Sequence, residues 1–226
     1  MLRPRRVDLE KLREYVLSKR GKDGGYLSYQ YMDLFESSAE DTYYAVSSLQ
    51  ALGRETPRAS DTARFLLRLQ REDWDYASLP VAYYAVKALA LLVMRPRDVE
   101  RAVEYFSKIL EHVIEEGGGN TSHVGYVAEE HFLPEGSLRS LGASGILVEA
   151  EMPTALASAS LAVEGLTVLG RKPLDIRKEV IDFVLELKTP VGDFRVRGPS
   201  IESVYHAVKT LLLLGYDIGE LTSTRD

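Results

Sequence analysis

The 226-residue sequence contains no cysteine. This absence excludes disulfides, a thiolate nucleophile and a cysteine-ligated zinc site. Amide side chains are also scarce, with one asparagine and three glutamines. Their scarcity, beside 28 Lys and Arg and 34 Asp and Glu residues, favours a thermophilic source.

An excess of positive charge is missing as well. The formal net charge is −6 and the pI is near 5.4, which argues against a nucleic-acid-binding surface. The longest nearly apolar run, ALALLVM at residues 88–94, is too short to span a bilayer. The opening MLRPRR is basic but is followed by no apolar run, so we expect no signal peptide and a cytoplasmic location.

A helical pattern recurs along the chain. It reads DTYYAVSSLQALG at 41–53, VAYYAVKALALLV at 81–93 and SVYHAVKTLLLLG at 203–215, with a weaker copy, SASLAVEGLTVLG, at 158–170. The shared small and apolar residues fall at steps of 1, 3 and 3, which places them on one stripe of a helix. We expect three stripe alanines, Ala45, Ala85 and Ala207, to be buried where inner and outer helices approach closely; the weaker copy supplies Ala162 at this position. Glycine ends three copies, and Val93 ends the second.

A more highly charged helical pattern precedes each copy, at residues 8–19, 60–71, 98–116 and 174–188. Three of these are followed by a turn and an aromatic residue, in KDGGY, REDWDY and PVGDF. No convincing strand-like alternation intervenes. Outer helix, turn and inner helix repeat with a period of about 40 to 45 residues, which is typical of stacked αα hairpins.

An outer helix, a Gly-aromatic turn and a YYAV helix that ends in LG resemble the prenyltransferase/squalene-cyclase repeat, and most closely that of protein prenyltransferase β subunits. The resemblance covers most of the chain and implies an α/α toroid, in which inner helices surround a central apolar cavity. A complete toroid of this family has more hairpins than the four visible here.

We therefore predict one all-α domain over residues 1–226, an incomplete α/α toroid of about four helical hairpins. The repeats are expected at approximately 8–53, 58–94, 98–170 and 174–216. The third repeat contains a Gly-rich insertion at 117–150, for which we expect short helices at most.

The resemblance also bears on zinc. In the prenyltransferase β subunits the last inner helix carries an acidic-x-Tyr-His pattern whose His binds zinc, and ESVYHAVKTLLLLG places His206 at that position. The family's other two ligands, an Asp and a Cys, fall on Ala155 and Ala157. Its basic diphosphate-binding residues fall on Glu149 and Met152. Since a lone His is no metal site, we predict no zinc, no other cofactor and no zinc-dependent prenyl transfer.

The second branch of the superfamily, the class II cyclases, protonates an alkene with an Asp-x-Asp-Asp cluster. The sequence offers DWDY at 73–76 and AEDT at 39–42. Each lacks at least one required carboxylate, so neither supports cyclase chemistry of that kind.

If His206 faces the cavity, the helical register places Tyr44, Tyr84 and Leu161 beside it, with Asp41 one turn before Tyr44. Together these five residues predict an aromatic cavity that suits an apolar ligand with one polar end. In the alternative interpretation, the tyrosines fill the narrow centre of a small toroid with their hydroxyls bonded to neighbours, and His206 is structural. No catalytic residue and no metal ligand is predicted.

Three functions stay open. The first is a non-catalytic module that binds an apolar, isoprenoid-like small molecule or a peptide. The second is a prenyltransferase- or terpene-cyclase-like enzyme that uses Asp41, Tyr44 and His206. The third is an assembly scaffold: the last helix is apolar all round, with four leucines at 211–214, so we expect a homodimer or a helical protein partner.

Overall fold

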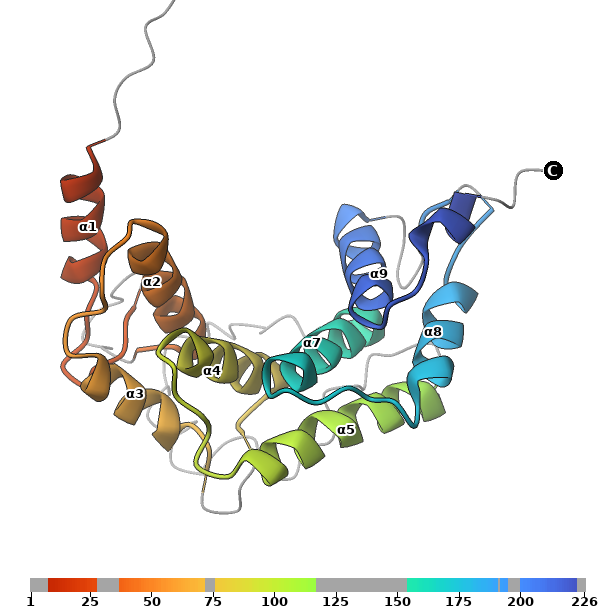
Figure 1. The fold of residues 1–226 in the computed structure, drawn as a ribbon, viewed down its shortest axis with the longest axis horizontal. Coiled ribbons are helices and arrows are strands. Elements are labelled where there is room, and N and C mark those ends of the chain that lie inside the picture. Colours follow the sequence, from red (N-terminus) through yellow and green to blue (C-terminus); the bar gives the residue numbers. More distant parts are fainter. Residues whose placement is uncertain are drawn as a thin grey trace, which may run out of the picture. The chain divides into compact units, whose positions relative to one another are not determined.

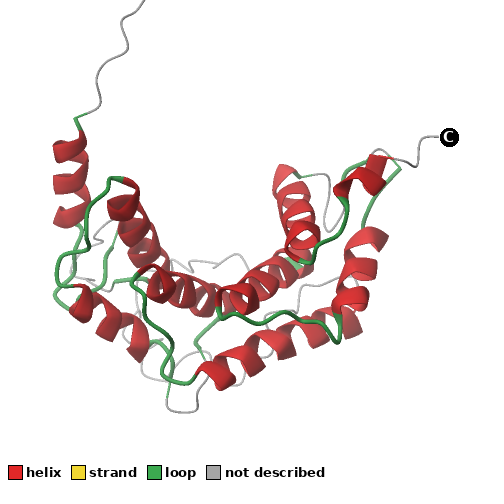
Figure 2. Cartoon of the chain, viewed as in Figure 1, coloured by secondary structure: helices red, strands yellow, loops and turns green. Residues whose placement is uncertain are grey.

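The computed structural model describes residues 8–27, 37–71, 76–116, 154–190, 192–194 and 200–222. All regular structure in these ranges is helical, which confirms the all-α prediction (Figures 1 and 2). The helices are α1 (Leu9–Ser18), α2 (Ala39–Ala51), α3 (Ala59–Arg68), α4 (Leu79–Leu91), α5 (Val99–Glu116), α7 (Ala155–Val168), α8 (Arg177–Glu186), α9 (Ile201–Leu213) and the 3₁₀ helix η2 (Ile218–Thr222). The expected insertion at 117–150 lies outside the described residues, as does most of DWDY.

The chain divides into two compact units, residues 1–76 with 80–99 and residues 77–79 with 100–226. The first contains α1, α2, α3 and nearly all of α4, and the second contains α5, α7, α8, α9 and η2. Within the first unit α1 lies beside α2, and within the second α9 lies beside α7 and α8 (Figure 1). Each unit therefore holds two pairs of one outer and one inner helix. A single domain over residues 1–226 stays a prediction.

The inner helices bury the stripe that the repeat predicts. The exposed fraction is 9% at Ala45 and 0% at Ala85, Ala162 and Ala207. The leucine that follows on each stripe is at most 1% exposed, at positions 49, 89, 166 and 211. In the second unit the contact between outer and inner helix is very close, because a Cβ added to Gly165 would lie 2.6 Å from the Phe106 ring.

Local hydrogen bonds fix where the helices begin. The side chains of Asp8, Ser38, Thr154 and Ser200 each accept a hydrogen bond from a backbone N–H in the first turn of the helix that follows. These side chains satisfy donors that have no partner within the helix. Acidic residues in the first turns, such as Asp41 of α2, add a favourable interaction with the helix dipole.

The inner helices end in the same way, including the one that lacks a glycine. Gly53, Gly170 and Gly215 have φ values of 66°, 76° and 70°, and Val93 has 58°. At each end the next amide donates to a carbonyl five residues back, as in the 2.8 Å bond from Met94 to Leu89. A β-branched residue is strained in this left-handed conformation. Val93 therefore preserves the helix end at a cost that glycine avoids.

The turn between α1 and α2 is held by its aromatic residue. Tyr26 is fully buried, and its backbone N–H donates to the Thr42 hydroxyl at 2.9 Å. Gly24, at φ 98°, leaves no room for a Cβ, which would lie 2.6 Å from the Asp61 carbonyl oxygen. The aromatic residues of the other two turns, Tyr76 and Phe194, are 2% and 3% exposed. A buried aromatic residue thus closes the turn in three of the four hairpins.

Among the described residues, no helix combines the length and the apolar composition needed to cross a lipid bilayer.

Candidate functional site

Four tyrosine rings join the inner helices of the first unit. Tyr43 and Tyr44 belong to α2, and Tyr83 and Tyr84 belong to α4. The ring centroid of Tyr84 lies 5.6 Å from that of Tyr43, 5.7 Å from that of Tyr44 and 4.9 Å from that of Tyr83. These spacings and tilted geometries are typical of favourable aromatic pairs. We call these four rings the tyrosine cluster.

The structure brings the predicted site residues Tyr44 and Tyr84 together. Their hydroxyl oxygens lie 3.4 Å apart, within hydrogen-bond distance. Burial raises the pKa of Tyr84, and the hydrogen bond with Tyr44 and the negative charge of Glu40 raise it further. Tyr84 is therefore a neutral phenol at physiological pH. Tyr44 is 52% exposed, so this part of the cluster is open to solvent.

The Lys87 side chain contacts two rings of the tyrosine cluster, those of Tyr43 and Tyr83. Its ammonium group donates a 2.9 Å hydrogen bond to the Tyr83 hydroxyl. The same group lies 4.7 Å from the ring centroid of Tyr43 and 4.8 Å from that of Tyr83. Two aromatic faces therefore stabilise a half-buried cation on an otherwise apolar surface.

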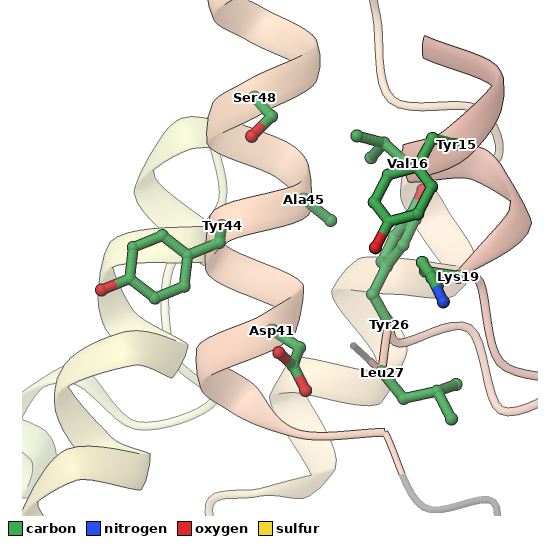
Figure 3. A pocket seen from close by; sticks show the side chains of 9 residues that line it. All are labelled: Tyr15, Val16, Lys19, Tyr26, Leu27, Asp41, Tyr44, Ala45 and Ser48. Carbon is green, nitrogen blue, oxygen red and sulfur yellow. The ribbon is translucent and has the colours of Figure 1, made fainter. Parts of the chain in front are cut away.

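Asp41 lies beside a pocket between α1 and α2 (Figure 3). The pocket has a volume of about 170 Å³ and is lined by Tyr15, Val16, Lys19, Tyr26, Leu27, Asp41, Tyr44, Ala45 and Ser48. Ala45 points from α2 toward α1, whereas the Tyr44 ring extends away from α1 (Figure 3). Tyr44 thus belongs both to the lining of the pocket and to the tyrosine cluster.

A buried phenol stands in the wall of this pocket. The hydroxyl of Tyr26 has no hydrogen-bond partner among the described residues. Burial raises the pKa of Tyr26, and the nearby Arg20 guanidinium opposes that shift without meeting hydrogen-bond geometry. A buried hydroxyl without a partner is rare and offers a hydrogen bond to a ligand or an ordered water.

The remaining two predicted site residues belong to the second unit. Leu161 on α7 and His206 on α9 are both half-buried. His206 Nε2 lies 3.8 Å from a carboxylate oxygen of Glu202, and its Nδ1 is buried without a hydrogen-bond partner in the described part of the chain. Burial lowers the pKa of His206, Glu202 and Glu164 oppose this shift, and Lys209 adds to it. The imidazole is therefore neutral near pH 7.

A mostly buried ion pair lies beside His206. Lys209 Nζ of α9 lies 2.5 Å from Glu164 Oε2 of α7, with side-chain exposures of 23% and 14%. The Lys209 ammonium also donates to the Tyr205 hydroxyl at 2.9 Å. Burial alone would lower the pKa of Lys209, but the bonds to Glu164 and Tyr205 outweigh burial and raise it. Lys209 therefore stays charged.

The residues at the family's zinc-ligand positions do not fit that metal. Ala155 and Ala157 are 0% and 3% exposed and carry no donor atom beyond the backbone. His206 is thus left without the two side chains that would complete a tetrahedral site. In the described ranges, no group of three His, Asp or Glu side chains is placed to hold a metal ion. Glu149 and Met152 lie outside those ranges.

The five predicted site residues divide between the two units. Asp41, Tyr44 and Tyr84 lie in the first, and Leu161 and His206 in the second. Our sequence reasoning missed the charged residues Lys19, Lys87, Glu164 and Lys209. One signal for two of them was present in the repeat: Lys87 and Lys209 follow Ala-Val at the same register position.

A comparison with protein families matches the Prenyltransferase alpha-alpha toroid domain at residues 1–75 and 72–222. The two matches together cover nearly the whole chain, so the protein belongs to this family of helical toroid domains. A comparison with curated proteins finds no match.

Proposed function

We propose that this prenyltransferase-like domain binds an apolar, isoprenoid-like ligand or peptide against the tyrosine cluster, and that it performs no zinc-dependent prenyl transfer. One observation carries the proposal: Tyr44 presents a half-exposed ring whose hydroxyl is paired with that of Tyr84. An apolar ligand that covers this face gains aromatic contact without leaving these two hydroxyls unpaired.

The residues of α7 support the second half of the proposal. Zinc-dependent transfer in this family needs side-chain ligands, and Ala155 and Ala157 supply none. The neutral imidazole of His206, with an unpartnered Nδ1, is better suited to accept or donate one hydrogen bond than to bind zinc alone. The protein is then a binding module rather than a transferase.

Binding of a fluorescent geranylgeraniol analogue to the full chain tests the proposal. Tyr44→Ala removes the exposed ring and should weaken binding about 10-fold, equivalent to the loss of about 1.4 kcal/mol. Leu9→Ala is the matched control, because Leu9 is a similarly exposed apolar side chain (57%) on the outer helix α1 and lines neither the pocket nor the tyrosine cluster. Equal affinities for the wild type and both variants, or no binding at all, would contradict the proposal.

The exposed side of α9 favours assembly as a second function. Ile201, Tyr205 and Leu212 are 90%, 55% and 59% exposed, and their spacing places them on one face of the helix. Exposed apolar stripes of this kind commonly mark protein contacts. Light scattering should report a mass above the monomer that Leu212→Glu lowers. A monomeric wild type would rule out a homodimer and leave only a different helical partner to sustain this function.

A further inference from the structure

The pocket between α1 and α2 combines opposite charges with apolar walls, and nothing in the family assignment accounts for it. We propose that it binds a small zwitterion with an aliphatic side chain, of the chemical class of branched aliphatic α-amino acids. This goes beyond the proposed function, because the pocket lies between α1 and α2, whereas the tyrosine cluster joins α2 to α4, and only Tyr44 belongs to both.

The walls set the size and polarity of the apolar part. Val16 comes from α1, Ala45 from α2, and Tyr26 and Leu27 from the turn between them. At about 170 Å³ the pocket is smaller than sites for drug-sized ligands, which start at about 300 Å³. It therefore fits one short aliphatic branch and not a long isoprenoid chain.

Two unpaired charges of opposite sign line the same pocket. Lys19 and Asp41 are both half-buried, and within the described part of the chain neither has an ion-pair partner. The Lys19 ammonium lies 5.1 Å from the Tyr15 ring centroid. The hydrogen bond that Asp41 makes to the Ser38 hydroxyl uses its backbone amide and not its carboxylate. Figure 3 shows Asp41 on α2 and Lys19 directly after the end of α1.

These charges discriminate between ligand classes. A purely apolar ligand would cover an ammonium and a carboxylate without pairing them, which is costly. A simple anion is attracted by Lys19 and repelled by Asp41, and a simple cation meets the reverse. Only a ligand with both charges satisfies both side chains, with its ammonium toward Asp41 and its carboxylate toward Lys19.

Two further polar groups are available at the pocket. Ser48 is exposed and lines the pocket, so its hydroxyl can bond to a ligand there. The buried Tyr26 hydroxyl has no partner among the described residues and offers a further hydrogen bond to the ligand, directly or through water. The polar head of an α-amino acid has donors and acceptors for both.

Isothermal titration calorimetry of the full chain tests this with three matched probes. L-leucine carries both charges, 3-methylbutylamine lacks the carboxylate, and 4-methylpentanoate lacks the ammonium, while all three keep the branched chain. Leucine should bind at least about 10-fold more tightly than either analogue, because each charge-assisted hydrogen bond contributes that factor or more.

Two pocket variants test which side chain binds which charged group of the ligand. Asp41→Asn should abolish the preference for leucine over 4-methylpentanoate, and Lys19→Gln should abolish its preference over 3-methylbutylamine. Glu40→Gln and Lys11→Gln are the controls, because they remove neighbouring charges on α2 and α1 that do not line the pocket. Both controls should keep the 10-fold preference.

The proposal is overturned if folded wild-type protein, checked by circular dichroism, gives no binding heat for leucine up to about 10 mM. It is also overturned if leucine binds no better than its analogues, or if both pocket variants retain the preference. Binding of the geranylgeraniol analogue depends on Tyr44 in the proposed function, so failure here leaves that test unaffected.

Discussion

Lys87 in the first unit and Lys209 in the second occupy the same register position of the repeat, but their charges are stabilised differently. Each donates a 2.9 Å hydrogen bond to the tyrosine one turn earlier on its own helix. Across to the neighbouring inner helix, Lys87 meets the ring of Tyr43, whereas Lys209 meets the carboxylate of Glu164. One helical pattern thus carries an aromatic contact in one unit and an ionic contact in the other.

The different contacts of Lys87 and Lys209 indicate different roles for the inner helices of the two units. A cation held by rings leaves the surrounding surface apolar, as the proposed ligand face around Tyr44 requires. A mostly buried ion pair ties α7 to α9 but contributes little apolar surface, and its loss leaves a charge without a partner. The first unit is therefore better arranged for an apolar ligand, and the second for fixed packing between its helices.

The largest expected effect comes from breaking the ionic contact. Glu164→Gln leaves Lys209 charged in a mostly buried position, which should lower the free energy of unfolding by about 3 kcal/mol. Lys87→Met keeps most of the packing and removes only the contacts to rings and hydroxyl, at a cost of about 1 kcal/mol. Urea denaturation of both variants measures the contrast, and equal losses would contradict the distinction between the units.

A smaller effect is expected at the helix ends, where Val93 of the first unit matches Gly170 of the second. Gly170→Val should cost about 1–2 kcal/mol through its positive φ, because no atom lies within 4 Å of a Cβ placed there. Val93→Gly relieves the same strain but frees the unfolded chain, so it should stabilise by only about 0.5 kcal/mol. Thermal unfolding measures both, and destabilisation by Val93→Gly would refute the strain.

The smallest effect concerns pH. His206 stands where α2 and α4 carry Tyr44 and Tyr84, and burial lowers its pKa below the ordinary 6.5. Because the unfolded chain then binds the proton more readily, stability should fall as pH drops below about 6.5 and level off beneath the folded-state pKa. His206→Tyr has no titration there and should show a flatter profile. Urea midpoints at about pH 7 and pH 5 compare the two proteins, and parallel profiles would argue against a buried neutral imidazole.

Sequence periodicity was sufficient to predict the packing of the repeat. Ala45, Ala85 and Ala207 are buried as expected, and the leucines of the same stripe are buried with them, because a helical register fixes which residues share a face. The same register predicted that Tyr44 and Tyr84 would be neighbours, and their hydroxyls are 3.4 Å apart. These features follow from spacing within single helices and from the equivalence of the repeats.

Contacts between non-equivalent positions could not be read in this way. Glu164 pairs with Lys209 across two helices whose facing residues differ in kind, and the repeat pattern does not say which pairs meet. The pocket of Lys19 and Asp41 depends on how the turn with Tyr26 brings α1 against α2. The left-handed backbone conformation of Val93 could not be predicted from the sequence, because β-branched residues normally avoid that conformation.

Photo-crosslinking with a benzophenone ester of geranylgeraniol tests the central proposal most directly, because it locates the ligand on the chain. Mass spectrometry of the digested full-length protein should find the adduct in peptides that contain α2 or α4, at the tyrosine cluster, and Tyr44→Ala should reduce its yield. An adduct confined to peptides without α2 or α4, or a yield that Tyr44→Ala leaves unchanged, would contradict the proposal that this surface binds the apolar ligand.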